Sequence, residues 1–222
     1  MLRMGDTGPD WYRKLVSPLI ALGDDYFVER FQDEMLKGME KMWEYTGEKR
    51  PPFAETPRPG QESVWDYPRP PKLVADKRRV VVRFAATTIA DSVETYRVLE
   101  TASPPTFYIP ARDVRIELLQ AFPGGSVCEW KGTAKYWAWK ASSSPHEALG
   151  WSYPTARPPY ELISGYFSFY PGRVECFVGN ERVRPQSGHF YGGWVTDARS
   201  SGHGKASAVR NRGDLPQGRF RL

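Results

Sequence analysis

The spacing of apolar residues changes near residue 48, and it predicts one helix before that point and mostly strands after it. Phe27, Phe31, Met35 and Met39 recur four residues apart, so we expect a helix over residues 25–45. A broad stripe of methionine and aromatic side chains fits a helix that packs on the main domain, which we favour. The alternative is a helix that contacts a second copy of the chain as a homodimer, or another partner.

Residues 48–61 hold four prolines and a glycine, which predicts an extended linker. After it, two β-branched runs at residues 79–84 and 87–91, joined by Ala85-Ala86, predict a hairpin. Further alternating runs predict strands at residues 96–100, 106–109, 136–140, 167–169 and 174–178. Residues 114–118 fit either a strand or a short helix, 123–125 a turn, and 160–165 a helix that begins after Pro158-Pro159.

The densest aromatic stretch spans residues 128–139 and contains three tryptophans, a tyrosine and a cysteine. Lys131-Gly132 can turn the chain, and the residues after it alternate as a strand does. Each large ring hides roughly 150–250 Å² when it is covered. We therefore expect this stretch at the centre of a β-domain, where it would line any pocket.

These patterns divide the chain into four parts: a helical arm (1–47), a proline-rich linker (48–61), a β-domain (62–184) and an extension with a basic tail (185–222). The net charge of +5 arises entirely in residues 199–222, which hold six Lys or Arg residues and one Asp. Residues 1–198 then carry 31 − 6 = 25 basic and 26 − 1 = 25 acidic residues. The neutral body is not predicted to bind nucleic acid, and the tail has too few apolar residues to fold alone.

The two cysteines and three histidines limit the chemistry further. Cys128 and Cys176 form neither a disulfide framework nor a metal-binding CxxC pair, so we expect no structural zinc site. No apolar run approaches the roughly 20 residues that a membrane helix needs, and the N-terminus lacks the pattern of a secretory signal. We expect a protein of a reducing compartment, cytoplasmic or organellar, without membrane contact.

Several short motifs together resemble the DUF427 family. They occur in the order and spacing of that family over residues 62–180: Glu62 to Pro71, Ala90-Asp91-Ser92, Arg97 to Thr101, Tyr108-Ile109-Pro110, Cys128 to Gly132 and Trp151-Ser152-Tyr153-Pro154. One residue departs from the pattern, because Glu129 stands where the family usually has proline. The resemblance implies a compact, mainly β fold of the tent-like, Mss4-like kind. Some family members carry a nucleotidyltransferase label, and no established reaction follows from the resemblance.

Nucleotidyl transfer needs a phosphate-binding loop and usually paired carboxylates that hold Mg²⁺. The sequence contains no G-x-x-x-x-G-K-[ST] loop, and no expected strand carries a D-x-D or D-x-E pair. Gly124-Gly125 lacks the lysine and the helix that would follow in such a loop. The residues therefore disfavour this reaction, and no cofactor or metal can be named from them.

A small molecule bound in an aromatic-lined pocket is the function that we favour, with acid/base catalysis as an extension of it. Burial beside aromatic rings shifts the pKa of carboxylates upward and of lysines downward, which is how catalytic groups are tuned. The candidate catalytic residues are Glu100, Lys131 and Cys128. The alternative for Lys131 is a solvated lysine in a turn, and the alternative for Cys128 is an inert thiol packed in the core. The candidate ligand-binding residues are Trp65, Tyr67, Arg69, Arg97, Trp130, Tyr136, Trp151 and Tyr153.

Two other classes remain open. A non-catalytic binding module would enclose a flat or cationic ligand with rings alone, and an assembly module would use the helix and both arms. An enzyme differs from an aromatic cage in having an ionisable group among the rings.

A motif W-x-Y-P followed by R-P-P also occurs twice, at Trp65 to Pro71 and at Trp151 to Pro159. It reflects either two equivalent edges of one domain or coincidence.

Overall fold

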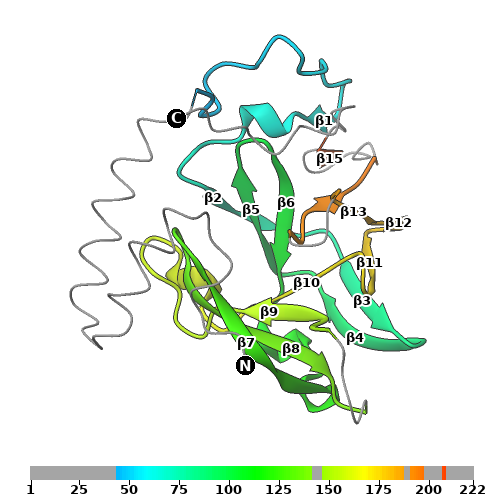
Figure 1. Ribbon diagram of the computed structural model, residues 1–222. Helices are drawn as coiled ribbons and strands as arrows, with labels where there is room; N and C mark the ends of the chain where they lie inside the picture. The colour runs from blue at the N-terminus through cyan, green and yellow to red at the C-terminus, as the bar shows by residue number, and fades with distance from the viewer. Residues whose placement is uncertain (1–43, 142–146, 188–190, 198–206, 209–222) are drawn as a thin grey trace, which may run out of the picture.

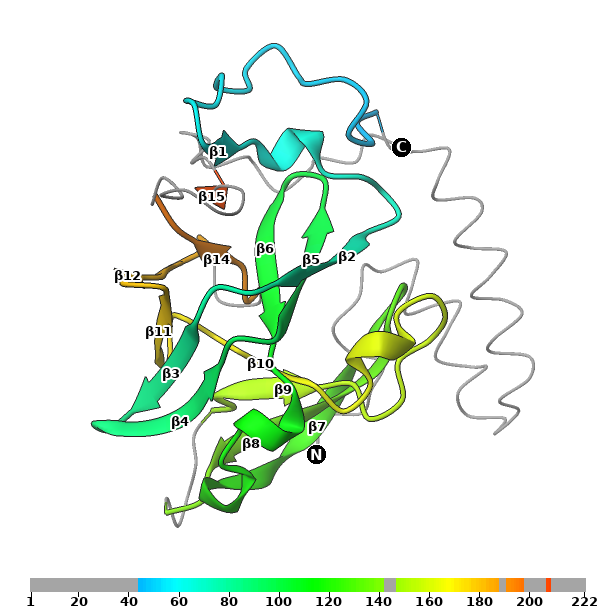
Figure 2. The same ribbon diagram turned by 180° about the vertical axis from the view of Figure 1, so that it is seen from behind.

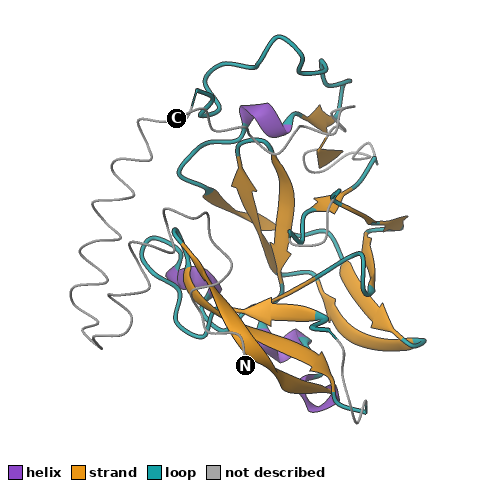
Figure 3. Cartoon of the chain, in the orientation of Figure 1, coloured by secondary structure: helices purple, strands orange, loops and turns teal. Residues whose placement is uncertain are grey.

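A computed structural model describes residues 44–141, 147–187, 191–197 and 207–208, and strands dominate them. Helical structure in these residues is confined to short 3-10 turns: η1 (Val64–Asp66), η2 (Ala111–Asp113), η3 (Ile116–Leu118) and η4 (Glu161–Ile163) (Figure 3). The longer strands are β2 (Lys72–Asp76), β3 (Val80–Phe84), β4 (Thr87–Ser92), β5 (Thr95–Glu100), β6 (Ser103–Tyr108), β7 (Leu119–Cys128) and β8 (Gly132–Trp139). The shorter ones are β1 (Gln61–Glu62), β9 (Gly150–Ser152), β10 (Phe167–Phe169), β11 (Glu175–Val178), β12 (Glu181–Arg182), β13 (Arg184–Pro185), β14 (Trp194–Val195) and β15 (Ser207–Ala208).

Three antiparallel sheets form the body, with strand orders β10-β9-β8-β7, β12-β11-β3-β4 and β2-β5-β6. Figures 1 and 2 show the β2-β5-β6 sheet between the segment that carries η1 and the β7–β10 sheet. The β3-β4-β11 sheet lies beside both. Two small pairs complete the pattern: β13 with β14, antiparallel, and β1 with β15, parallel. The expectation of a mainly β fold is therefore confirmed.

The predicted hairpin forms from β3 and β4. Phe84 pairs with Thr87, so the loop consists of Ala85 and Ala86 alone. Both alanines have positive φ angles, 48° and 62°, as a two-residue turn of the primed type requires. The two β-branched runs predicted these strands correctly, although they gave no sign of left-handed alanines.

Proline and glycine misled the sequence analysis at two other places. Strand β6 begins at Ser103 and includes Pro104 and Pro105, three residues before the strand predicted at 106–109. The prolines fit because β6 is an edge strand, where a missing N–H leaves no sheet bond unmade. The turn predicted at residues 123–125 is instead a bulge inside β7, between Phe122 and Gly125. Residues 116–118 form the short helix, and η4 is shorter than the helix predicted over 160–165.

The largest core lies where the sheets meet around β3, β6, β10 and β11. Val80, Val82, Phe169 and Cys176 are fully buried in it, and Trp194 stacks on Phe107 with ring centroids 4.9 Å apart. A second cluster gathers aromatic rings around Tyr108 and Trp151, and a third holds Trp65 and Leu99 below η1. The second cluster is the one against which Lys131 packs.

Some predictions are not tested by the described residues. The helix over residues 25–45, and a homodimer through it, lie almost entirely outside the described residues and stay predictions. The tent-like, Mss4-like arrangement and the four-part division of the chain also stay predictions. Within the described residues, no helix has the length and apolar character needed to cross a membrane.

Candidate functional site

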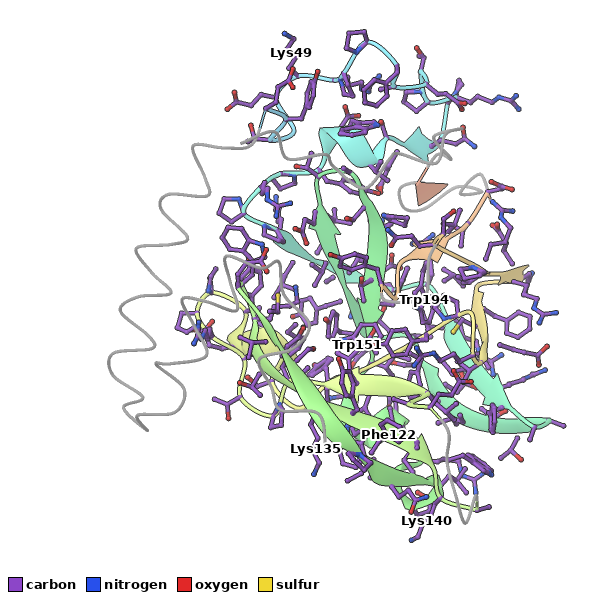
Figure 4. The ribbon with its side chains drawn as sticks, in the orientation of Figure 1. Lys49, Phe122, Lys135, Lys140, Trp151 and Trp194 are labelled. Carbon is purple, nitrogen blue, oxygen red and sulfur yellow. The ribbon has the colours of Figure 1, made fainter. Side chains whose placement is uncertain are left out.

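The rings around Tyr108 and Trp151 form what we call the aromatic cluster. Its buried rings are Tyr108, Trp151, Tyr153 and Tyr160, and its partly buried members include Cys128, Trp130, Tyr136 and Tyr170. Tyr108 meets Trp151 edge-on at 6.4 Å between centroids, and Trp151 meets Tyr170 at 4.5 Å. Figure 4 shows Trp151 near the middle of the molecule.

Antiparallel pairing of β7, β8 and β9 assembles this cluster. Cys128 pairs with Gly132, so residues 129–131 form the connection of a tight hairpin. Tyr136 pairs with Trp151, which puts the aromatic stretch and the second W-x-Y-P motif side by side. Gly132 has a φ of 89° and lies against Arg157, where a Cβ would come within 3.3 Å of the arginine Cγ. The hairpin therefore closes directly onto the segment that carries Tyr153 and Tyr160.

Lys131 is the central cation of the cluster and is only 7% exposed. Its Nζ lies 5.9 Å from the ring centroids of both Tyr153 and Tyr160. Burial lowers the pKa of Lys131, but Tyr108 and Cys128, in their ionised forms, and the carboxylate of Glu100 raise that pKa by more. Lys131 is therefore held as a cation. It is not the neutral amine that a general base would need.

The phenols around Lys131 stay neutral at neutral pH. Burial raises the pKa of Tyr108, of Tyr153 and of Tyr160, the last to about 12. Trp151 donates its indole N–H to the Tyr108 hydroxyl over 3.3 Å, and the Tyr160 hydroxyl donates to the carbonyl of Pro71 over 2.8 Å. Neutral phenols do not cancel a charge, and Glu100 is the carboxylate whose charge acts on Lys131.

Arg69 and Glu100 border the cluster on the side of β5. The guanidinium of Arg69 lies 2.8 Å from the Glu100 carboxylate and 3.5 Å from that of Glu129. Burial raises the pKa of Glu100, while the charges of Arg69 and Lys131 lower it by less, so the net shift is upward. The Trp130 ring lies beside this group, with the Arg69 guanidinium 5.9 Å from its centroid. Glu129, the departure from the family pattern, thus shares Arg69 with Glu100.

The Trp130 N–H is buried next to the Glu100 carboxylate, which it helps to stabilise in the charged form. It nevertheless has no hydrogen bond of good geometry to any other described residue. No group of three or more His, Cys, Asp or Glu residues that could hold a metal ion occurs in the described part of the chain.

The remaining candidate residues lie elsewhere. Trp65, within η1, and Tyr67, which directly follows η1, pack in the third core cluster. Arg97 is 4% exposed and bridges two carboxylates, with 2.9 Å to Glu62 and 2.9 Å to Asp76. Tyr67 donates its hydroxyl to Glu62 over 2.8 Å. Tyr67 and Arg97 therefore belong to a buried ion network that joins η1 to β2 and β5, apart from the aromatic cluster.

Sequence reasoning missed several residues of the cluster. Tyr108 and Tyr160 appeared only as parts of a motif and of an expected helix, and Arg157 only within the repeated motif. That motif was a usable signal, because its two copies meet here: Arg69 of the first copy pairs with Glu100, and the backbone N–H of Arg157 in the second donates to the Lys131 carbonyl over 3.3 Å. The two tryptophans of the motif lie in different clusters, so the copies are not equivalent edges.

Comparison with known proteins identifies the part of the chain that carries this cluster. Residues 72–180 match the family model NTP_transf_9, described as a domain of unknown function (DUF427). The match includes Glu100, Cys128, Lys131 and Trp151 and leaves out Arg69, which lies just before it. No curated protein matches the chain.

Proposed function

The chain belongs to the DUF427 family through residues 72–180, and we propose that its aromatic cluster binds the acidic group of a small molecule on Lys131. Glu100, beside it, exchanges a proton with the bound molecule. The ligand enters over the half-buried edge of the cluster, which is made by Cys128, Glu129 and Trp130. This function needs neither a metal nor a phosphate-binding loop.

The environment of Lys131 is the observation that carries the proposal. Taking a cation out of water is costly unless an anion or several polar groups replace the lost hydration. Lys131 is buried, it keeps its charge, and among the described residues no carboxylate lies within ion-pair distance of its Nζ. Its neighbours are a thiol and neutral phenols. An entering carboxylate or phosphate would supply the missing negative charge at low effective dielectric, where the attraction is strong.

Glu100 is the group suited to proton exchange. Its pKa is raised by burial, which brings its protonation closer to neutral pH than that of an exposed glutamate. It is also 23% exposed on its side chain, so a ligand over the edge of the cluster can reach it. A protonated Glu100 would donate a hydrogen bond to an acidic ligand, whereas a charged Glu100 would repel it.

The ionisable residues among the rings favour an acid-binding site over a cage made of rings alone. An aromatic cage attracts a cationic ligand through the negative electrostatic potential on the faces of its rings. Here Lys131 already lies near two of those faces, Tyr153 and Tyr160, which would repel a second cation. A non-catalytic module that binds an acid without changing it remains the alternative to an enzyme.

Binding of simple acids to the full chain tests the proposal. Inorganic phosphate, citrate and benzoate are titrated by calorimetry against the wild type and Lys131→Met. The control is Lys140→Met, which removes an exposed lysine at the far end of β8, well apart from Trp151 in Figure 4. We expect Lys131→Met to weaken binding at least tenfold and Lys140→Met to leave it unchanged. Equal affinities of the wild type and Lys131→Met would overturn the proposal.

The role of Glu100 is tested by pH. Protonating Glu100 removes a negative charge near the bound acid, so affinity should fall as pH rises through the raised pKa of Glu100. Glu100→Gln should bind about as well as the protonated wild type and lose this pH dependence. Nuclear magnetic resonance of the incubated acid separates the two classes: conversion by the wild type but not by Glu100→Gln marks an enzyme, and an unchanged acid marks a binding module.

A further inference from the structure

The segment Tyr191 to Val195 follows the matched family region and returns to the aromatic cluster. Trp194 anchors it: the ring is 1% exposed, stacks on Phe107, and donates its indole N–H to the Phe169 carbonyl over 3.0 Å. The pairing of β14 with β13 fixes the backbone next to this ring. The position of the segment is therefore set by the main core.

Gly192 brings the segment into contact with the cluster. A Cβ at this position would come within 2.3 Å of Trp151 Cη2 and 3.3 Å of Tyr170 Cδ1. The backbone therefore lies directly on these two rings, as close as a residue without a side chain permits. Figure 4 shows Trp151 and Trp194 near each other where the segment crosses the molecule.

Tyr191 directly precedes Gly192 and therefore lies beside the two rings that Gly192 contacts. Burial of its hydroxyl, and the carboxylates of Glu129 and Glu100, raise the pKa of Tyr191, while Arg69 lowers it by less. The thiol of Cys128 contributes in the same direction as the carboxylates. These four groups border the site, yet the Tyr191 side chain remains 68% exposed. A large exposed ring beside a charged site is a contact surface for the apolar part of a ligand.

We propose that Tyr191 is a ligand-contacting residue of the site and that the ligand is an organic acid, with its acidic end at Lys131 and its apolar body against the Tyr191 ring. This inference rests on the proposed function and adds the substrate class to it. It also makes the segment after residue 180 part of the site, although the family match ends there. Inorganic phosphate has no apolar body, so its binding should not depend on Tyr191.

The experiment compares two acids and four variants of the full chain. Benzoate and inorganic phosphate are titrated against the wild type, Tyr191→Ala and Lys131→Met, with Leu162→Ala as a control for loss of an exposed apolar side chain on η4. We expect Tyr191→Ala to weaken benzoate binding about tenfold and to leave phosphate binding unchanged. Tyr191→Phe should bind benzoate nearly as the wild type does.

The outcomes separate the two ideas. The proposed function is overturned if neither acid binds, or if both acids bind Lys131→Met as well as the wild type. Lys131-dependent binding of benzoate that is equal in the wild type and Tyr191→Ala overturns the role of Tyr191 alone. A readout without ligand tests the placement itself: iodoacetamide should alkylate Cys128 several-fold faster in Tyr191→Ala, with the fully buried Cys176 as internal reference. An unchanged rate would also overturn the inference.

Discussion

Arg69 and Glu100 form an ion pair at the border of the aromatic cluster, with 2.8 Å between guanidinium nitrogen and carboxylate oxygen. The arginine side chain is 9% exposed and the glutamate side chain 23%. The pair connects the first W-x-Y-P motif to the end of β5. It also leaves Lys131 without a carboxylate of its own, because Glu100 and Glu129 are both held on Arg69.

Replacing Arg69 with methionine should destabilise the protein by about 2 kcal/mol. Removing one partner of a buried pair leaves the other charge uncompensated, which costs roughly 3–5 kcal/mol when burial is complete and less at partial exposure. The loss should be larger at pH 7 than at pH 4, where Glu100 accepts a proton. Urea unfolding at both pH values measures it. The control Arg50→Met removes a half-exposed pair with Asp66 and should change stability far less; equal losses would contradict the prediction.

The stability of the wild type relative to Glu100→Gln should depend on pH. The pKa of Glu100 is raised from 4.5 in the folded protein, so between 4.5 and the raised value the folded state binds more protons than the unfolded state. The contribution of Glu100 to stability is therefore present at low pH and is lost as pH rises through this window. Urea unfolding at pH 4, 5, 6 and 7 should show Glu100→Gln gaining on the wild type as pH rises. A difference independent of pH would contradict the raised pKa.

Particular residues show what the sequence could predict. β-branched runs located β3 and β4, and alternation located β8, in which buried residues recur at every second position near its start. Pro104 and Gly124 misled the prediction, since their effect depends on whether a strand lies at an edge or carries a bulge. That property belongs to the assembled sheet.

The candidate site was predicted in part for a similar reason. Lys131, Glu100 and Trp151 were found because the family motifs contain them, and they do come together. Nothing in the local sequence separates Tyr67 and Arg97 from this group, because they are also aromatic or charged residues of the same motifs. Only the packing of η1 against β2 and β5 assigns them to the ion network. Tyr191 lies beyond the motifs that supplied the candidate residues.

Arg97→Met should be strongly destabilising, with a loss of about 3 to 5 kcal/mol in the free energy of unfolding. The guanidinium is buried between Glu62 and Asp76. Burial raises the pKa of Asp76, but Arg78 and Arg97 lower it by more, so the pKa of Asp76 lies below its ordinary value. Without Arg97 the partly buried Glu62 loses its cation, and the buried Asp76 keeps only Arg78. Chemical denaturation measures the loss. The matched variant Arg79→Met breaks an exposed pair with Asp91 and should have little effect.

If Arg97→Met unfolds as the wild type does, the network contributes no stability and Arg97 becomes available for a role in binding. The variant should leave benzoate affinity unchanged, because Arg97 lies outside the aromatic cluster. A loss of affinity without a loss of stability would therefore return Arg97 to the list of ligand-binding residues.

The turn between β3 and β4 can be improved, which tests the conformation of its two alanines. Ala85 and Ala86 have φ angles of 48° and 62°, and a left-handed backbone costs a residue with a Cβ roughly 1–2 kcal/mol. Glycine avoids that cost but loses about 0.5–1 kcal/mol through the entropy of the unfolded chain. Ala86→Gly should therefore stabilise the protein by about 0.5–1 kcal/mol, and adding Ala85→Asn should increase the gain, because asparagine tolerates this conformation. Thermal unfolding measures the stability of both variants.

The control Ala75→Gly makes the same change at an exposed position within β2, where it should destabilise the protein instead. Destabilisation by Ala86→Gly equal to that of the control would mean that the turn does not hold its alanines in the left-handed region.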